Sequence, residues 1–128
     1  MIVNIMNKKT GIYIISGGVV CFTSTIPWND KSPISELQKQ IEQVHNYWKE
    51  HGRGTSISSV ILSGHGSLAD GIASKCCLPC SSNIDIHVEV GNVWQNVFSY
   101  DKYIPPISHE DSLDYATSAG LALPLYFI

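Results

Sequence analysis

The stretch Ser59-Val60-Ile61-Leu62-Ser63-Gly64-His65-Gly66-Ser67-Leu68-Ala69-Asp70-Gly71 decides the fold that the sequence predicts. Its apolar first part is typical of a strand buried in a parallel sheet, and its glycine-rich part is typical of a turn into a helix, here expected over residues 67–76. Gly64 and Gly66 can adopt positive φ and leave no Cβ in the way of a ligand. Such a turn at the carboxyl end of a parallel strand indicates a nucleotide site formed by Gly64, His65, Gly66 and Ser67. The simpler alternative is a turn that serves tight packing alone.

Three strand-like segments precede this stretch and are joined by short turns. They lie at residues 2–5, 10–15 and 19–26 and are rich in β-branched and aromatic side chains. The paired glycines of Ser16-Gly17-Gly18 supply the positive φ that a tight hairpin turn requires. These segments predict an antiparallel three-stranded meander.

An amphipathic helix is expected between the meander and the buried strand. Its apolar face is formed by residues three or four positions apart, namely Ile34, Leu37, Ile41, Val44 and Trp48. Ser32 is suited to the N-cap of this helix and Pro33 to its first position. His45 and His51 lie off the apolar face and are expected to be solvated.

The second half of the sequence predicts one more strand and one more helix. Residues 83–90 alternate between apolar and polar side chains, so Asp85, His87 and Glu89 share one face of a strand. A solvent-facing edge strand explains this polar triplet more simply than a metal or acid–base site does. Residues 110–123 predict a final helix with small side chains that allow close packing on the sheet. The order β-β-β-α-β-α-β-α favours an α/β fold, a single ribonuclease-H-like lobe of the kind found in actin-like ATPases.

Composition and length narrow the classes of protein and partner. A chain of 128 residues with 44% hydrophobic and 15% charged side chains is expected to form one packed domain over residues 1–128. The net charge is −3 and no basic stripe is visible, which argues against nucleic acid as a partner. No segment approaches the roughly 20 apolar residues of a membrane-spanning helix, and the N-terminus does not resemble a signal peptide. We therefore expect a soluble cytoplasmic protein.

Four cysteines raise the question of thiol or metal chemistry. Cys77-Leu78-Pro79-Cys80 is a C-x-x-C sequence, which could form a redox pair or half of a zinc site. Zinc would need two further ligands, and neither Cys21 nor Cys76 belongs to a second paired spacing. Reduced thiols are expected in the absence of a secretory signal, with redox activity through Cys77 and Cys80 as an alternative.

Several of these segments resemble one protein family as an ordered set. Residues 60–71 resemble the adenosine-contacting motif of actin-like ATPases, a strand followed by a glycine-rich turn. Residues 88–98, 103–106 and 112–123 are similar to the C-terminal part of the type IV pilus assembly protein PilM family, and the hairpin at residues 14–27 also resembles that family. The resemblance touches most of the chain. It implies the actin-like fold that FtsA-like division proteins share, and a bacterial protein at the cytoplasmic face of the inner membrane. It also implies ATP and Mg²⁺ as ligands and the cytoplasmic tail of PilN as the partner within the pilus assembly platform.

The sequence departs from the family at the positions that would hold the nucleotide. Asn4 to Thr10 correspond to the phosphate loop, but Asn4 stands at the position of an Asp and Met6 at that of a Gly. Asn cannot supply the negative charge that orients Mg²⁺ and water, and Met6 adds bulk where backbone would approach phosphate. His65 occupies a position where the family usually has Gly. By this resemblance we also expect residues 1–128 to lack the family's N-terminal lobe and, at residues 27–33, its inserted subdomain.

These departures favour a function without catalysis. We expect a truncated PilM-like binding or structural module that does not hydrolyse ATP and binds it weakly if at all. The alternatives are an ATP-binding half-site completed by a second chain, the thiol redox protein considered above, and a gene remnant without activity.

Overall fold

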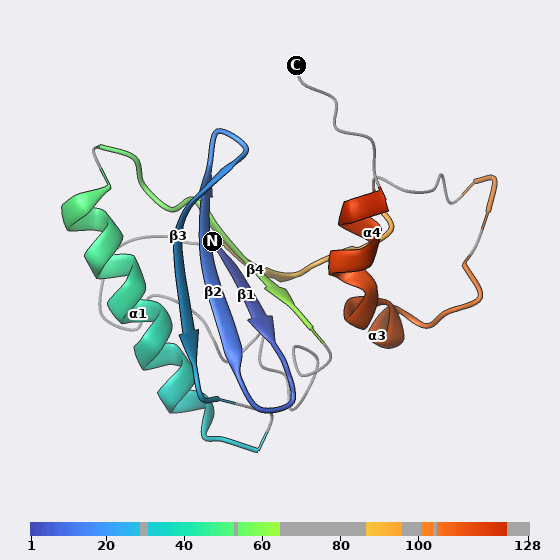
Figure 1. Ribbon diagram of the computed structural model, residues 1–128, viewed down its shortest axis with the longest axis horizontal. Coiled ribbons are helices and arrows are strands. Elements are labelled where there is room, and N and C mark those ends of the chain that lie inside the picture. The colour runs from blue at the N-terminus through green and yellow to red at the C-terminus, as the bar shows by residue number, and fades with distance from the viewer. Residues whose placement is uncertain (29–30, 53, 65–86, 96–100, 104, 123–128) are drawn as a thin grey trace.

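Five strands form one mixed sheet with helices on both sides (Figure 1). The computed structural model describes residues 1–28, 31–52, 54–64, 87–95, 101–103 and 105–122. The strands are β1 (Ile2–Ile5), β2 (Thr10–Ser16), β3 (Val19–Ile26), β4 (Ser59–Ser63) and β5 (His87–Val90), in the spatial order β3-β2-β1-β4-β5. β1, β2 and β3 pair antiparallel, whereas β4 pairs parallel with both β1 and β5. The predicted meander and the predicted parallel strand are both confirmed.

The hairpin between β2 and β3 follows its sequence closely. Gly17 and Gly18 have φ angles of +58° and +76°, the left-handed conformation that a tight hairpin turn requires. The register shifts between Ile14 and Ile15, because Ile14 pairs with Phe22 and Ile15 with Val20. Cys21 therefore has no partner on β2 and forms a β-bulge.

Helix α1 (Ile34–His51) packs on one face of the sheet through its apolar stripe. The core lies between them and contains Val3, Ile5, Ile12, Ile14, Trp28, Leu37, Ile41, Val60 and Leu62, together with residues at its margin. The expected cap at Ser32 is wrong: the N-cap is Pro33, which has an extended ψ of 134° and no side-chain cap. Its carbonyl oxygen instead accepts hydrogen bonds from the Glu36 N–H at 3.1 Å and the Trp28 indole N–H at 3.0 Å. These two bonds fix the start of the helix.

The expected exposure of the two α1 histidines is half right. His51 is exposed and stacks on Tyr47 with ring centroids 4.5 Å apart. His45 is buried, because residues 54–58 lie beside that part of the helix and line a cavity together with His45 and Trp48. The apolar stripe alone therefore underestimates the surface of α1 that the chain covers.

Trp28 and Thr10 link the end of the meander to the core. Trp28 is 1% exposed and Thr10 is fully buried. The Thr10 hydroxyl donates to the Trp28 carbonyl oxygen at 2.8 Å, and the Trp28 N–H donates to the Ile26 carbonyl oxygen at 3.0 Å. Thr10, expected in a phosphate-loop-like segment, thus lies in the core with its hydroxyl already hydrogen-bonded.

Replacing Thr10 with valine tests this bond at nearly constant side-chain volume. The variant leaves the buried Trp28 carbonyl oxygen without its donor, so we expect the free energy of unfolding to fall by about 1–3 kcal/mol in urea denaturation. Thr23→Val is the matched control, because Thr23 is exposed on β3. Equal free energies of unfolding for the two variants would show that the Thr10 bond adds nothing to stability.

The C-terminal segment does not form the continuous helix expected over residues 110–123. It is divided into α3 (His109–Ser112), the 3₁₀ turn η2 (Leu113–Tyr115) and α4 (Ala116–Ala122). Ser108 caps α3, since its hydroxyl accepts the Asp111 N–H at 3.1 Å. The Ser112 hydroxyl donates to the His109 carbonyl oxygen at 2.6 Å, a local bond that competes with regular helix geometry at the point where η2 begins.

Of the helix and strand predicted directly after β4, the structure describes only part of the strand. β5 covers residues 87–90 of the expected strand at 83–90 and is an edge strand, as predicted. His87 and Glu89 are exposed, with His87 Nε2 3.4 Å from Glu89 Oε2. Asp85 and the expected helix at 67–76 lie outside the described residues.

Candidate functional site

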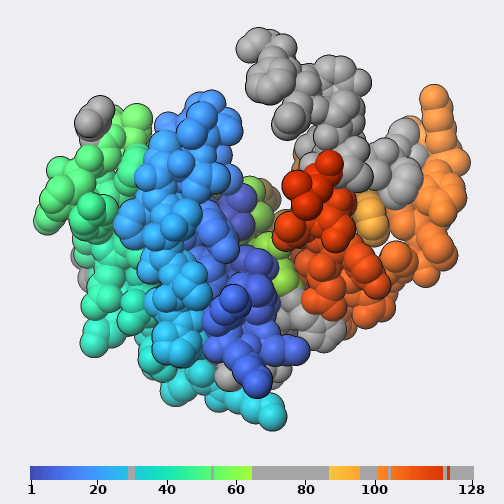
Figure 2. Space-filling model, viewed as in Figure 1, coloured from blue at the N-terminus to red at the C-terminus, as the bar shows by residue number. Residues whose placement is uncertain are grey.

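A cleft opens on the sheet face opposite α1, between the meander and α4 (Figure 2). It includes a cavity of about 500 Å³ at the carboxyl ends of β1 and β4. The lining residues are Asn4, Ile5, Met6, Asn7, Gly64, Leu113, Asp114, Ala116 and Thr117. The parallel pairing of β1 with β4 brings their carboxyl ends to the same edge, which is where ligand sites occur in open α/β sheets.

Gly64 and Asn4, taken from two separate sequence motifs, are neighbours in this cavity. Asn4 pairs with Ser63 in the sheet, so the residue after β4 lies against the end of β1. Gly64 has a φ of +86°, and a Cβ at this position would collide with the Ile5 carbonyl oxygen and lie 2.8 Å from Asn4 Oδ1. Glycine is therefore required here by the close approach of two backbones as well as by the backbone conformation.

The β1–β2 turn forms the second side of the cavity. Met6 lines the cavity, and its N–H donates to the Lys9 carbonyl oxygen at 3.0 Å. This bond closes the turn, so the Met6 N–H is not available to a phosphate group. Asn4 and Asn7 offer neutral amides on the same side.

The third side comes from the C-terminal segment, which sequence reasoning did not connect with the site. Leu113 is 2% exposed and anchors η2, and Asp114, Ala116 and Thr117 follow it along the cavity wall. One indication of this arrangement was present in the sequence, because the small side chains of residues 116–122 predict close packing on the sheet. Nothing in the sequence indicated that Asp114 would line the same cavity as Asn4 and Gly64.

A second hollow of about 320 Å³ continues the cleft over β1, β4 and β5. Ile2 and Ile61 contribute from the middle of the sheet, Glu89 from β5, and Ala116 from the wall that it shares with the first cavity. The Gly91 N–H donates to the Leu62 carbonyl oxygen at 2.8 Å and carries the β4–β5 pairing one residue further.

The remaining predicted site residues lie elsewhere or outside the described part of the chain. Thr10 is in the core, as described above. His65, Gly66, Ser67, Cys77 and Cys80 fall in the segment that the structure does not describe, so their predicted roles stay predictions. Cys21 is exposed, and the described residues include no group of three or more His, Cys, Asp or Glu side chains placed to hold a metal ion.

The chemistry of the lining favours polar recognition over phosphate neutralisation. Among the described residues that line the first cavity, Asp114 carries the only formal charge, and none is a lysine or arginine. A carboxylate with nearby amides can accept and donate hydrogen bonds to hydroxyl groups, and it repels phosphate oxygens.

Comparison with known proteins gives a likeness at the level of fold. No protein-family model matches the sequence, and no curated protein matches it. Among solved structures, a chain described as "PilM-PilN type IV pilus biogenesis complex" superposes with a TM-score of 0.69 at 15% sequence identity. The match covers 94% of this chain and 44% of that chain, so the present chain spans less than half its length. The expected resemblance to the PilM fold is therefore confirmed. Among the described residues, no helix has the length and apolar character needed to cross a membrane.

Proposed function

We propose that this chain is a PilM-like binding module of the type IV pilus assembly platform that does not hydrolyse ATP. One observation carries the proposal: the end of β1 and the β1–β2 turn present Asn4, the Met6 side chain and an already bonded Met6 N–H to the cavity where the fold would place phosphates. Phosphoryl transfer depends on metal ions and charged side chains that are positioned around the phosphates. This side of the cavity supplies neutral groups instead.

The carboxylate in the cavity lies on another wall. Asp114 belongs to η2, whereas Asn4 belongs to β1. A Mg²⁺ ion bridging two phosphates is normally held by carboxylates together with water and phosphate oxygens, and Asn4 offers a neutral amide oxygen at the sheet side. The cleft is also open in Figure 2, and an open cleft excludes water poorly. Both features support binding without turnover.

The expected activity of the purified chain is phosphate release from ATP no faster than in a sample without protein. Asn4→Ala serves as the matched variant, since it removes the polar group at the sheet side of the cavity. Mg²⁺-dependent hydrolysis that Asn4→Ala abolishes would overturn the proposal that the module is inactive.

By its fold, the proposed partner is the cytoplasmic tail of a PilN-like protein. Fluorescence anisotropy with a labelled tail peptide tests this part directly, and a scrambled peptide of the same composition is the control. Saturable binding of the native peptide alone supports the assignment to the pilus platform, whereas equal binding of both peptides contradicts it.

An ATP-binding half-site is the second candidate, because the structure joins Gly64 and Asn4 from the two nucleotide-related segments in one cavity. Calorimetric titration with ATP, with and without Mg²⁺, separates the two candidates. Removing the Asp114 charge by Asp114→Asn should strengthen ATP binding if the cavity holds the phosphates, because the carboxylate repels them. Heats equal to those of dilution favour the first candidate.

A further inference from the structure

The outer edge of β3 carries no charged side chain, although charge is one usual protection of a strand edge against pairing. β3 is the last strand of the sheet formed by the described residues, and each of its residues is at least partly exposed. The sequence has no charged residue between Lys9 and Asp30. Exposed edges in soluble proteins commonly carry lysine, proline or a bulge that prevents pairing with another strand.

The unprotected part of this edge has two clear ends. The bulge at Cys21 distorts the ladder at one end, and Pro27, which has no N–H, follows the strand at the other. Between them lies the regular segment Phe22-Thr23-Ser24-Thr25-Ile26.

The alternation of the ladder shows which backbone groups face outward. The Met6 N–H bond to the Lys9 carbonyl closes the β1–β2 turn. Because hydrogen-bonded pairs alternate along an antiparallel ladder, the backbone groups of Gly11 and Tyr13 then bond to β1. Thr10, Ile12 and Ile14 of β2 bond instead to β3. Their partners there are Ile26, Ser24 and Phe22, respectively. The N–H and C=O groups of Thr23 and Thr25 therefore point away from the sheet.

We propose that a second copy of this chain occupies this edge, pairing β3 with β3 in antiparallel, two-fold symmetric register centred on Ser24. In that register Thr23 lies opposite Thr25 of the second copy, and both have outward-facing backbone groups. Phe22 lies opposite Ile26 of the second copy. Thr–Thr and aromatic–β-branched pairs are among the favourable cross-strand pairs, and each occurs twice because the interface is symmetric.

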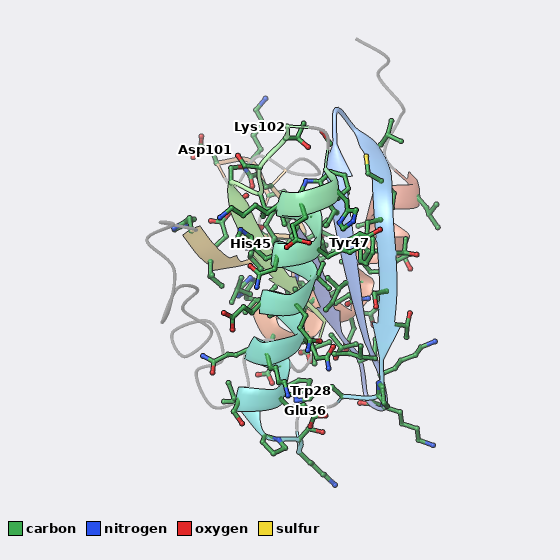
Figure 3. All side chains as sticks on the ribbon, turned by 90° about the vertical axis from the view of Figure 1, so that its left-hand side faces the viewer. Trp28, Glu36, His45, Tyr47, Asp101 and Lys102 are labelled. Carbon is green, nitrogen blue, oxygen red and sulfur yellow. The ribbon has the colours of Figure 1, made fainter. Side chains whose placement is uncertain are left out.

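The side chains make this pairing continuous with the existing core. Phe22 and Ile26 are partly buried and pack against the core on the α1 side. Tyr47 of α1, 48% exposed, lies 5.5 Å from Phe22 between ring centroids and on the side of α1 nearer β3 (Figure 3). Pairing through Phe22 and Ile26 would join the two cores across one ten-stranded sheet and cover apolar surface that water now reaches.

Other registers are less favourable on this strand. A shift of one residue places outward-facing groups of one copy opposite inward-facing groups of the other, so the ladder cannot form. Shifts of two residues bring Phe22 opposite Ser24, or Thr23 opposite Pro27. The segment therefore selects a single symmetric register, which is independent of any nucleotide or pilus partner.

Sedimentation equilibrium of the purified chain from 1 to 200 µM tests the dimer. We expect a concentration-dependent rise to twice the chain mass. The double variant Thr23→Lys with Thr25→Lys places like charges opposite each other in both pairs and should weaken dimerisation at least tenfold. The matched variant Thr23→Lys with Thr25→Glu places opposite charges there and should keep the dimer, with circular dichroism confirming the fold of both. A chain that stays monomeric at 200 µM, or equal association of the two variants, would overturn the proposal.

Disulfide trapping tests the register itself. With the four native cysteines replaced by serine, Ser24→Cys places two thiols at a pair on the two-fold axis, within the Cα separation that a disulfide requires. Oxidation should convert most of this variant to a covalent dimer, whereas Thr23→Cys in the same background should cross-link at least tenfold less. Equal cross-linking of the two would contradict the register centred on Ser24.

Discussion

Gly64→Ala is expected to destabilise the protein by about 2–5 kcal/mol in the free energy of unfolding. Two effects add at this position. An L-residue at a φ of +86° carries a conformational penalty of about 1–2 kcal/mol. The new Cβ also collides with the Ile5 carbonyl oxygen, so β4 must move away from β1 at further expense. Urea denaturation followed by circular dichroism measures the change.

Gly18→Ala separates the two effects. Gly18 also has positive φ, at +76°, but a Cβ there would meet nothing within 4 Å. We expect this variant to lose only the conformational part, about 1–2 kcal/mol. If both variants lose the same free energy, the close approach of β1 and β4 at the cavity does not constrain the fold.

Trp28→Ala is the second substitution with a large expected effect, a loss of about 3–5 kcal/mol in the free energy of unfolding. The indole is 1% exposed, so its removal leaves a large void in the core. The Pro33 carbonyl also loses the indole N–H that holds the start of α1. Chemical denaturation measures the loss, and amide hydrogen exchange should show faster opening in the first turn of α1.

Trp28→Phe is the control for the packing contribution. It keeps an aromatic ring in the core but removes the hydrogen bond to the Pro33 carbonyl oxygen, so the loss should be smaller, about 1–3 kcal/mol. A Trp28→Ala protein as stable as Trp28→Phe would show that the core closes over the void.

The sequence predicts the sheet well because its patterns are local. The β-branched runs and Gly17-Gly18 define β2, β3 and their turn, and the uninterrupted apolar run Val60-Ile61-Leu62 marks β4 as a buried parallel strand. Each of these features depends on residues close together in the chain. Intrinsic preference and tertiary packing agree in this part of the molecule.

The parts that sequence reasoning missed depend on contacts between distant residues or on a single hydroxyl group. The burial of His45 depends on residues 54–58, and the division of the last helix coincides with the Ser112 hydroxyl bond to His109. In the candidate site, Asn4 and Gly64 could be predicted as neighbours from the fold class. Asp114 could not, because only the packing of η2 brings it to the cavity.

The parallel pairing of β1 with β4 has a consequence for the order of folding. Ile2 pairs with Ile61, so the strands that floor the cleft are joined by nearly half of the chain, whereas β2 and β3 are joined by two residues. Closing a long loop costs more conformational entropy than forming a hairpin, and it is therefore slower. We therefore expect the β2–β3 hairpin to form early during folding and the cleft to be completed late. An emerging polypeptide would then complete the walls of this cavity only after residue 117 has been synthesised, well after the meander can form.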